Sequence, residues 1–368
     1  MHFLKRISHG RAAFILTVWA LGMRFHRLYY RDLWGDELYQ IKGMSGAFKP
    51  FWTARYNFGD HTAFAGDYLL CYPFLQVFGI NKWGLTVPHV LITILGFYWL
   101  YRICQRTYRS VWATAICFFL VAVNEELIFH HFEFRPYAVL PSLALGIYYF
   151  ADLMARDYSK TRPPVRWFAL FLLVFTFFYH AYGALIVLSA VSYCLLRHRA
   201  GTYRAWLLSP QARWLIVAIV IGLPIWIWFA AFNNFGAVSQ NTFKFTTVTT
   251  PQAITYPFDY IAHPLIEPVR FFKHMIGNLL GYNKVAYLFL AGFLFVFFPS
   301  DRRRDQMMFL MWMIIIPLML ILIIDLTTKY WFLPRQFIWV TPWFAILLAW
   351  LWDTGIQIFS KKTPVLEK

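Results

Sequence analysis

Long apolar stretches alternate with short polar segments along most of this 368-residue chain. Most of the stretches approach the ~20 residues that an α-helix needs to cross a bilayer. They cover approximately residues 12–29, 67–80, 85–101, 111–128, 137–154, 167–179, 181–196, 214–232, 285–299, 307–324 and 337–352. This pattern predicts an all-α polytopic membrane protein rather than a set of soluble domains.

The stretch at 67–80 determines the expected topology. If it crossed the membrane, every later loop would change side, and the basic clusters would be divided between the two faces. If it lies along the surface, all of the clusters face the cytoplasm, as the positive-inside rule predicts. We therefore expect about ten transmembrane helices, both termini inside, and an interfacial helix in the first outer loop. The basic clusters are Lys5/Arg6/Arg11, Arg102/Arg106/Arg109, Arg156/Lys160/Arg162/Arg166, Arg197/Arg199/Arg204/Arg213, Arg302/Arg303/Arg304 and Lys361/Lys362.

This topology predicts a single transmembrane domain over residues 1–368, without a separate soluble domain. Its two long connections, about 30–84 and 233–282, both lie on the outer side. Loops of that length are usually functional. The inner loops are short and basic, which is typical of connectors.

Composition and charge narrow the class further. Charged residues make up 14% of the chain, whereas soluble proteins average about 25%. The net charge of +17 does not indicate nucleic-acid binding, because the charges lie in short clusters between apolar stretches. Cys71, Cys104, Cys117 and Cys194 show no spacing typical of metal ligands. We therefore expect no disulfide framework, no metal and no other cofactor.

Polar groups that could take part in catalysis or binding gather at the predicted outer ends of the helices. Removing an ionised carboxylate from water costs several kcal/mol or more, so two adjacent acids beside the first helix need a reason. The outer groups are Asp36, Glu37, His61, Asp67, Asn124, Glu125, Glu126, His130, His131, Glu133, Arg135, His180, Asp325, Lys329 and Arg335. Their convergence on one side predicts an active site at the membrane surface.

A structural role is the alternative for each of these groups. Asp36 and Glu37 can cap a helix, because acids favour helix N-termini. Arg135 can pair with Glu133 or Glu126, and His180 can be a hydrogen-bonded interfacial histidine. The adjacent histidines 130 and 131 point apart on a helix, which disfavours a metal cluster there.

Several of these residues occur in an ordered series of short motifs. The series resembles the GT-C glycosyltransferases that use polyprenyl-phosphate sugars, in the protein O-mannosyltransferase and aminoarabinose-transferase-like group. The resemblance extends from about residue 12 to 350. The surface helix departs from it, since Ala65-Gly66-Asp67-Tyr68 stands where the family often has His/Lys-Pro-Pro. The motifs are Leu33-Trp34-Gly35-Asp36-Glu37, Gly79 after the surface helix, Glu133-Phe134-Arg135-Pro136-Tyr137, Tyr179-His180-Ala181-Tyr182-Gly183 and Pro334-Arg335-Gln336.

The resemblance implies a GT-C fold and an inverting transfer of a sugar to an acceptor hydroxyl. The donor is a polyprenyl-phosphate sugar, and the acceptor is a glycan, a lipid or a protein. The reaction takes place on the outer face of the cell's inner (plasma) membrane. The chemistry needs a carboxylate base and a cation for the leaving phosphate. The implied roles are catalysis by Asp36 and Glu37, phosphate binding by Arg335, Arg135 and Lys329, and sugar or acceptor binding by Glu133, Tyr137, His180 and His61.

A transporter or flippase of lipid-linked sugars is the main alternative, and a non-catalytic membrane scaffold is a further one. A transporter predicts charges near the centres of the spans and repeated halves of the sequence. In this chain most charges lie at the ends of the apolar stretches, and no internal repeat is evident. The sequence therefore favours an enzyme.

Overall fold

The computed structural model describes most of two parts of the chain, residues 8–224 and 301–362. Within them it omits residues 34–36, 39, 42–65, 158–159, 198–208, 211, 215, 219, 223 and 329–333. The long outer loop at 233–282 and the apolar stretch at 285–299 thus lie outside the described residues. So do three predicted site residues: Asp36, His61 and Lys329.

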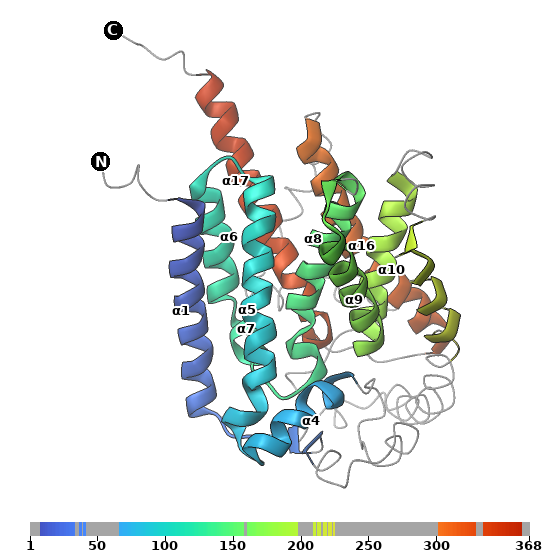
Figure 1. Cartoon of the computed structure of the whole chain (residues 1–368). Helices are drawn as coiled ribbons and strands as arrows, with labels where there is room; N and C mark the ends of the chain where they lie inside the picture. The colour runs from blue at the N-terminus through green and yellow to red at the C-terminus, as the bar shows by residue number, and fades with distance from the viewer. Residues whose placement is uncertain are drawn as a thin grey trace.

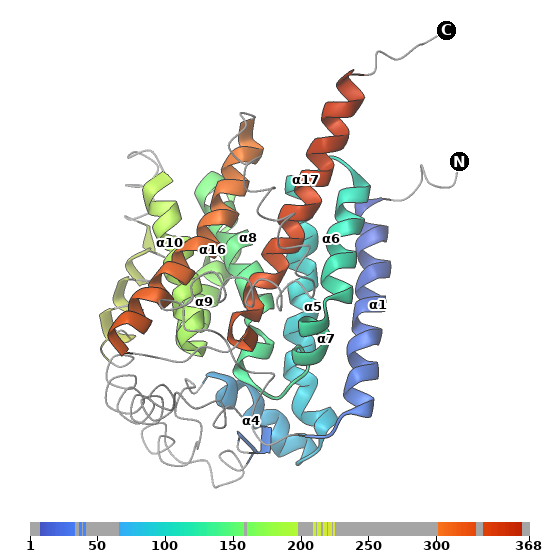
Figure 2. The same cartoon turned by 180° about the vertical axis from the view of Figure 1, so that it is seen from behind.

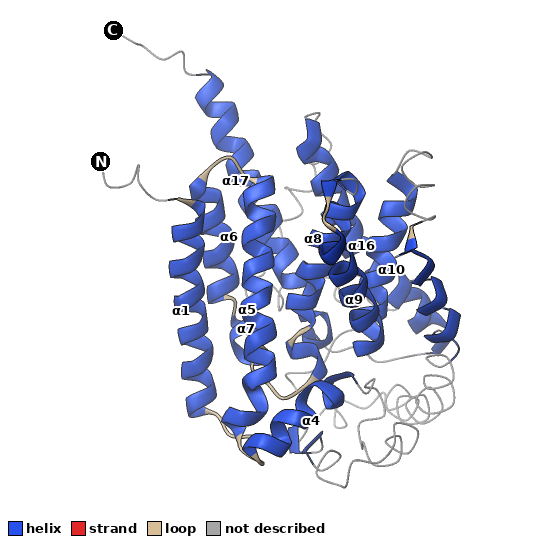
Figure 3. Cartoon of the chain, viewed as in Figure 1, coloured by secondary structure: helices blue, strands red, loops and turns tan. Residues whose placement is uncertain are grey.

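All regular secondary structure in the described residues is helical (Figure 3). This confirms the predicted all-α class. The helices are α1 (His9–Tyr30), α4 (Gly66–Phe78), α5 (Lys82–Thr107), α6 (Val111–Val123), α7 (Glu125–His130), η2 (Pro136–Ala138), α8 (Leu140–Asp157), α9 (Pro163–Tyr179), α10 (Ala181–Arg197), α16 (Asp301–Thr328), η5 (Pro334–Val340) and α17 (Thr341–Lys362).

The helices form a bundle with two flanks. Helices α1, α5 and α6 stand side by side on one flank, and α8, α9, α10 and α16 make the other (Figures 1 and 2). Helix α17 packs along α6, and α5 packs against α8, which joins the two flanks. Nearly the whole first half of α8 is buried, so this helix lies at the centre of the bundle.

The two ends of the bundle differ. The start of α1 and the end of α17 lie at one end, and α4 lies at the opposite end, below α5 (Figures 1 and 2). Helix α4 covers most of the stretch 67–80, for which a surface helix was expected. Its position at the end of the bundle is the one such a helix would take.

The apolar stretch at 111–128 is broken, although the sequence predicts one continuous helix there. Helix α6 ends at Val123, and the backbone of Asn124 is extended. The Asn124 side chain accepts a hydrogen bond from the Leu127 backbone N–H at 2.9 Å. Asn124 is therefore the N-cap of the short helix α7. The polar side chain explains the break, because it competes with the backbone for hydrogen bonds.

Arg24 on α1 stabilises the broken end of α6. Its guanidinium donates to the carbonyls of Val121 at 3.0 Å and Ala122 at 3.4 Å, and to Ala20 on its own helix at 2.9 Å. These α6 carbonyls lie where a helix ends and leaves acceptors without intrahelical partners. A fully buried arginine thus supplies the hydrogen bonds that water cannot.

The helices are compatible with a membrane. Lys82–Thr107 and Phe337–Gly355 are long and apolar enough to span one, and shorter apolar helices cover Val111–Val123, Pro163–Tyr179, Tyr182–Cys194 and Asp305–Pro317. Large apolar side chains on α1, including Phe14 and Ile15, are 70% and 63% exposed. A contiguous apolar face of this kind fits contact with lipid. The expected number of about ten spans stays a prediction.

Candidate active site

The described part of the site surrounds a small apolar cluster at α4, separate from the main core. It brings together the first outer loop, α4, the start of α5 and the segment that follows α7. Its buried members are Ile41, Tyr68, Cys71, Leu75, Leu85 and Phe134. Four segments distant in sequence therefore meet at the end of the bundle where the outer motifs were predicted to converge.

Glu37, one of the two predicted catalytic acids, is completely buried in a clamp. Arg31 binds it with two parallel hydrogen bonds, Nη1 to Oε2 at 2.7 Å and Nη2 to Oε1 at 2.9 Å. The Phe134 backbone N–H donates to Oε1 at 2.6 Å, and Arg31 also donates to the Phe132 carbonyl at 2.7 Å. Glu37 and Arg31 thus fasten the first outer loop to the segment after α7.

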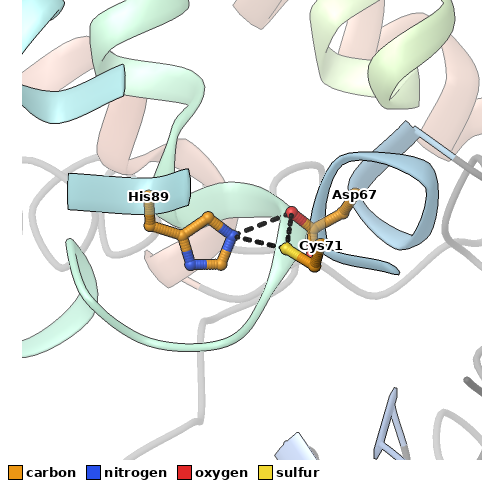
Figure 4. A group of neighbouring side chains, drawn as sticks. All are labelled: Asp67, Cys71 and His89. Carbon is orange, nitrogen blue, oxygen red and sulfur yellow. Dashed lines mark hydrogen bonds and ion pairs between the residues drawn. The ribbon is translucent and has the colours of Figure 1, made fainter. Parts of the chain in front are cut away.

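A second buried cluster forms around Asp67 on α4. His89 of α5 donates from Nε2 to Asp67 Oδ1 at 2.9 Å, and the Cys71 thiol lies 3.8 Å from the same oxygen (Figure 4). The Tyr179 hydroxyl also donates to Oδ1, and the Gln40 amide donates to Oδ2. Asp67 therefore joins α4 to α5, to the end of α9 and to the first outer loop.

The environment of Asp67 favours its ionised form. Burial alone would raise the pKa of this carboxyl, but the charge and hydrogen bond of His89, with the hydrogen bonds of Tyr179 and Gln40, outweigh burial and lower the pKa. Burial and the neighbouring Asp67 raise the pKa of the Cys71 thiol well above its ordinary value. The cluster therefore combines a carboxylate with a protonated thiol.

A third cluster contains His130 of α7. Its Nδ1 lies 2.6 Å from Glu133 Oε2, and its Nε2 lies 3.4 Å from Glu126 Oε2. Burial alone would lower the pKa of His130, but the hydrogen bonds and charges of Glu126 and Glu133 raise it to about 9. Glu133, predicted to contact sugar or acceptor, thus pairs with a cationic histidine.

The adjacent His131 faces a different group, as expected for neighbouring residues that point apart. Its Nδ1 accepts a hydrogen bond from Arg24 Nε at 2.9 Å. Burial and then the positive charge of Arg24 lower the pKa of His131 well below its ordinary value. His131 therefore stays neutral, while His130 carries a charge.

Arg135 and Tyr137, predicted to bind phosphate and sugar, lie together. Arg135 Nε donates to the Tyr137 hydroxyl at 3.2 Å, and its guanidinium lies 5.5 Å from the centre of that ring. The Tyr137 ring is also 6.1 Å from the ring of His130. Tyr137 therefore lies next to the His130 cluster, and Arg135 lies next to Tyr137.

His180 lies between α9 and α10, as its predicted position in a tight hairpin requires. Its Nδ1 accepts from the Tyr182 backbone N–H at 3.2 Å, and the two rings stack with centroids 5.1 Å apart. Tyr182 in turn contacts Phe337 in η5, the element that also contains Arg335. The side chain of Arg335 is outside the described part of the structure.

Sequence reasoning missed several residues of these clusters. Arg24 and His89 carried a usable signal, because each is a polar residue within an apolar stretch, where such groups are rare and usually functional or paired. Gln40 carried none, because its partner Asp67 lies on another segment. Arg31 and Cys71 lie near their partners Glu37 and Asp67 in sequence, but no motif marks these pairs.

No protein-family model matches this chain, and no curated protein matches its sequence. Its structure is similar to two solved structures of ArnT from Cupriavidus metallidurans. One is in the apo state (TM-score 0.57) and the other is bound to undecaprenyl phosphate (TM-score 0.58). Each is 17% identical in sequence, and the similarity covers 94% of this chain.

The chain spans 61% and 62% of the length of those two ArnT chains. The similarity shows a shared fold, and it confirms the fold that the sequence resemblance implied. The chain thus has the fold of ArnT.

The clamp predicts a large effect of Glu37 on stability. Glu37→Gln removes the charge opposite buried Arg31, and breaking a buried ion pair in this way typically destabilises a protein by about 3–5 kcal/mol. We expect a lower unfolding temperature of the detergent-solubilised protein. Glu125→Gln, at an exposed glutamate of α7, is the matched control and should change it little. Equal unfolding temperatures for Glu37→Gln and the wild type would contradict the clamp.

The His130 cluster predicts a pH dependence of stability. Because the pKa of His130 rises from 6.5 in the unfolded chain to about 9 in the fold, its stabilising charge is fully present below pH 6.5. It is lost as the pH rises through about 9. The facing groups are Glu126, Glu133, neutral His131 and Tyr137.

Thermal unfolding of the wild type between pH 6 and pH 9.5 should therefore show decreasing stability. His130→Gln should flatten this part of the profile, because glutamine does not titrate. A profile of unchanged slope in His130→Gln would rule out His130 as its source.

Proposed function

We propose that this protein is a membrane glycosyltransferase that moves a sugar from a polyprenyl-phosphate donor to an acceptor hydroxyl on the outer face of the plasma membrane. The observation that carries the proposal is the ArnT fold over 94% of the chain, shared with a structure solved with undecaprenyl phosphate bound. Helix α4, which carries Asp67, supports it, because this helix lies at the end of the bundle opposite the start of α1 and the end of α17 (Figure 1).

In the proposed reaction Asp36 is the general base. It accepts the proton of the acceptor hydroxyl while that oxygen forms a bond to the anomeric carbon of the sugar. The bond between this carbon and the phosphate oxygen breaks, and its electrons leave with the polyprenyl phosphate. Attack from the face opposite the phosphate inverts the anomeric centre.

Cations hold the leaving phosphate, on which negative charge develops in the transition state. We assign this role to Arg335, with Arg135 and Lys329 as further cationic contacts. Arginine suits the position because its planar guanidinium forms two parallel hydrogen bonds to a phosphate.

Other polar groups orient the sugar or the acceptor in this proposal. They are Glu133, Tyr137, His180 and His61. The geometry of Glu37 favours positioning over proton transfer, because Arg31 and the Phe134 backbone already occupy both of its oxygens. We therefore propose that the clamp on Glu37 holds the adjacent Asp36 at the donor.

The test of the base is Asp36→Asn, which is nearly isosteric but cannot accept the proton. We expect sugar transfer from a polyprenyl-phosphate sugar to fall by about 10²–10⁴-fold, with donor binding and unfolding temperature largely retained. Asp32→Asn, the same chemical change at an exposed aspartate nearby, should keep full activity.

The alternative capping role of Asp36 predicts the opposite outcome, because asparagine caps a helix about as well as aspartate. Near-normal turnover in Asp36→Asn would remove Asp36 as the base. If lipid-linked sugar crossed the membrane without being transferred, the transporter alternative would replace the enzyme.

The test of the phosphate contact is Arg335→Ala. We expect KM for the donor to rise strongly, because a charge-assisted hydrogen bond to phosphate is lost. Arg335→Lys should restore part of the affinity, since it keeps the charge without the planar fork. Arg162→Ala, at an exposed arginine before α9, is the control. Unchanged donor affinity in Arg335→Ala would move the role to Arg135 or Lys329.

A further inference from the structure

We propose that Asp67, Cys71 and His89 form a zinc site that fastens α4 to α5. The sequence analysis predicted no metal, because the four cysteines show no spacing relative to one another that is typical of metal ligands. The ligand atoms of the three proposed residues nevertheless face one another in the folded chain, with Asp67 and Cys71 on α4 and His89 on α5 (Figure 4). The proposal is independent of the glycosyltransferase assignment.

The distances between the three ligand atoms fit one face of a zinc tetrahedron. Asp67 Oδ1 and His89 Nε2 are 2.9 Å apart, Cys71 Sγ and His89 Nε2 are 3.5 Å apart, and Cys71 Sγ and Asp67 Oδ1 are 3.8 Å apart. Ordinary zinc–ligand bond lengths with tetrahedral angles place such atoms about 3.4–3.6 Å apart. Shifts of about half an ångström or less would therefore admit the ion.

The positions in the chain explain how the ligands converge. Asp67 and Cys71 are four residues apart on α4, so they lie on one face of that helix. The same spacing places the two histidines of a zinc-binding helix side by side. His89 lies about two turns into α5, beyond the turn at Gly79, where the chain has a positive φ of 69°. The ligands thus belong to two helices joined by a short connection.

The types of ligand select the metal. A thiolate, an imidazole and a carboxylate together suit zinc, whereas magnesium and calcium prefer oxygen ligands alone. All three side chains are completely buried. One carboxylate and one thiolate would balance the two positive charges of the ion, so the closed site would be neutral with a neutral histidine.

Two oxygen donors border the cluster and can complete a fourth position. The Tyr179 hydroxyl contacts Asp67 Oδ1. The amide of Gln40 contacts Asp67 through its nitrogen, while its Oε1 oxygen is buried without a hydrogen-bond partner in the described structure. A buried acceptor of this kind is unfavourable unless something binds it.

The alternative is a metal-free cluster in which Asp67 simply accepts hydrogen bonds from its neighbours. The direct test is the metal content of the full-length protein, purified in detergent with its affinity tag removed and measured by inductively coupled plasma mass spectrometry. We expect about one zinc per chain in the wild type. Cys71→Ser and His89→Gln should lose most of it. Cys194→Ser is the matched control, because this cysteine lies on α10 away from the cluster, and it should retain the zinc.

Cobalt provides a second readout that does not depend on catalysis. Protein stripped with a chelator and reloaded with Co²⁺ should show a thiolate-to-cobalt absorption band in the near ultraviolet. Cys71→Ser should lack this band, whereas Cys194→Ser should show it. A folded wild type that contains no zinc and gives no cobalt band would overturn the proposal in favour of the hydrogen-bonded cluster.

A third measurement covers the case in which the Cys71 and His89 variants fail to fold. X-ray absorption at the zinc edge of the wild-type protein should show one sulfur ligand at about 2.3 Å, with nitrogen and oxygen ligands at about 2.0–2.2 Å. Zinc surrounded by nitrogen and oxygen alone would be bound elsewhere, and such a spectrum would contradict the proposed site.

Discussion

The bidentate bond between Arg31 and Glu37 is the interaction on which the described site depends. Both side chains are buried, so neither charge can be left without the other except at a large desolvation penalty. The pair also takes one backbone donor and one backbone acceptor from residues 132–134. It therefore fixes the first outer loop against the segment that leads to Arg135 and Tyr137, two regions about 100 residues apart in sequence.

The clamp contacts the segment that follows α7, and α7 is separated from α6 by the break at Asn124. After the break at Asn124 the chain continues through α7 to His130 and then to Glu133 and Arg135. An interrupted helix leaves carbonyls without partners inside an apolar environment, where water cannot replace them. Arg24 supplies these hydrogen bonds from α1 and at the same time holds neutral His131. One buried arginine thus allows the polar segment to form.

The sequence predicted the helices well because their cause is local. Apolar stretches of helical length determine where α1, α5, α9 and α10 run. The pairings were not predictable in the same way. Arg24 with His131 and Asp67 with His89 depend on how helices pack. Arg31 and Glu37 are six residues apart just after α1, where no helical period relates them. Pattern alone contains neither kind of information. The break at Asn124 was a local signal that was misread, since the polar residues Asn124, Glu125 and Glu126 interrupt an otherwise apolar run.

The packing of α4 also bears on where a donor phosphate can bind. Relatives in the group that the sequence resembles often open this helix with His/Lys-Pro-Pro, whereas this chain has Gly66-Asp67. A Cβ at Gly66 would lie 2.5 Å from the Cα of Tyr179 and 2.8 Å from its carbonyl oxygen, so the first turn of α4 touches the end of α9 directly. Asp67 is fully buried and held by His89 and Tyr179, and the proposed zinc would leave this cluster without net charge, so the cluster offers no positive group to a phosphate. Within the proposed glycosyltransferase function, we therefore place the donor away from the start of α4 and assign its phosphate to the cations of η5 and of the segment after α7.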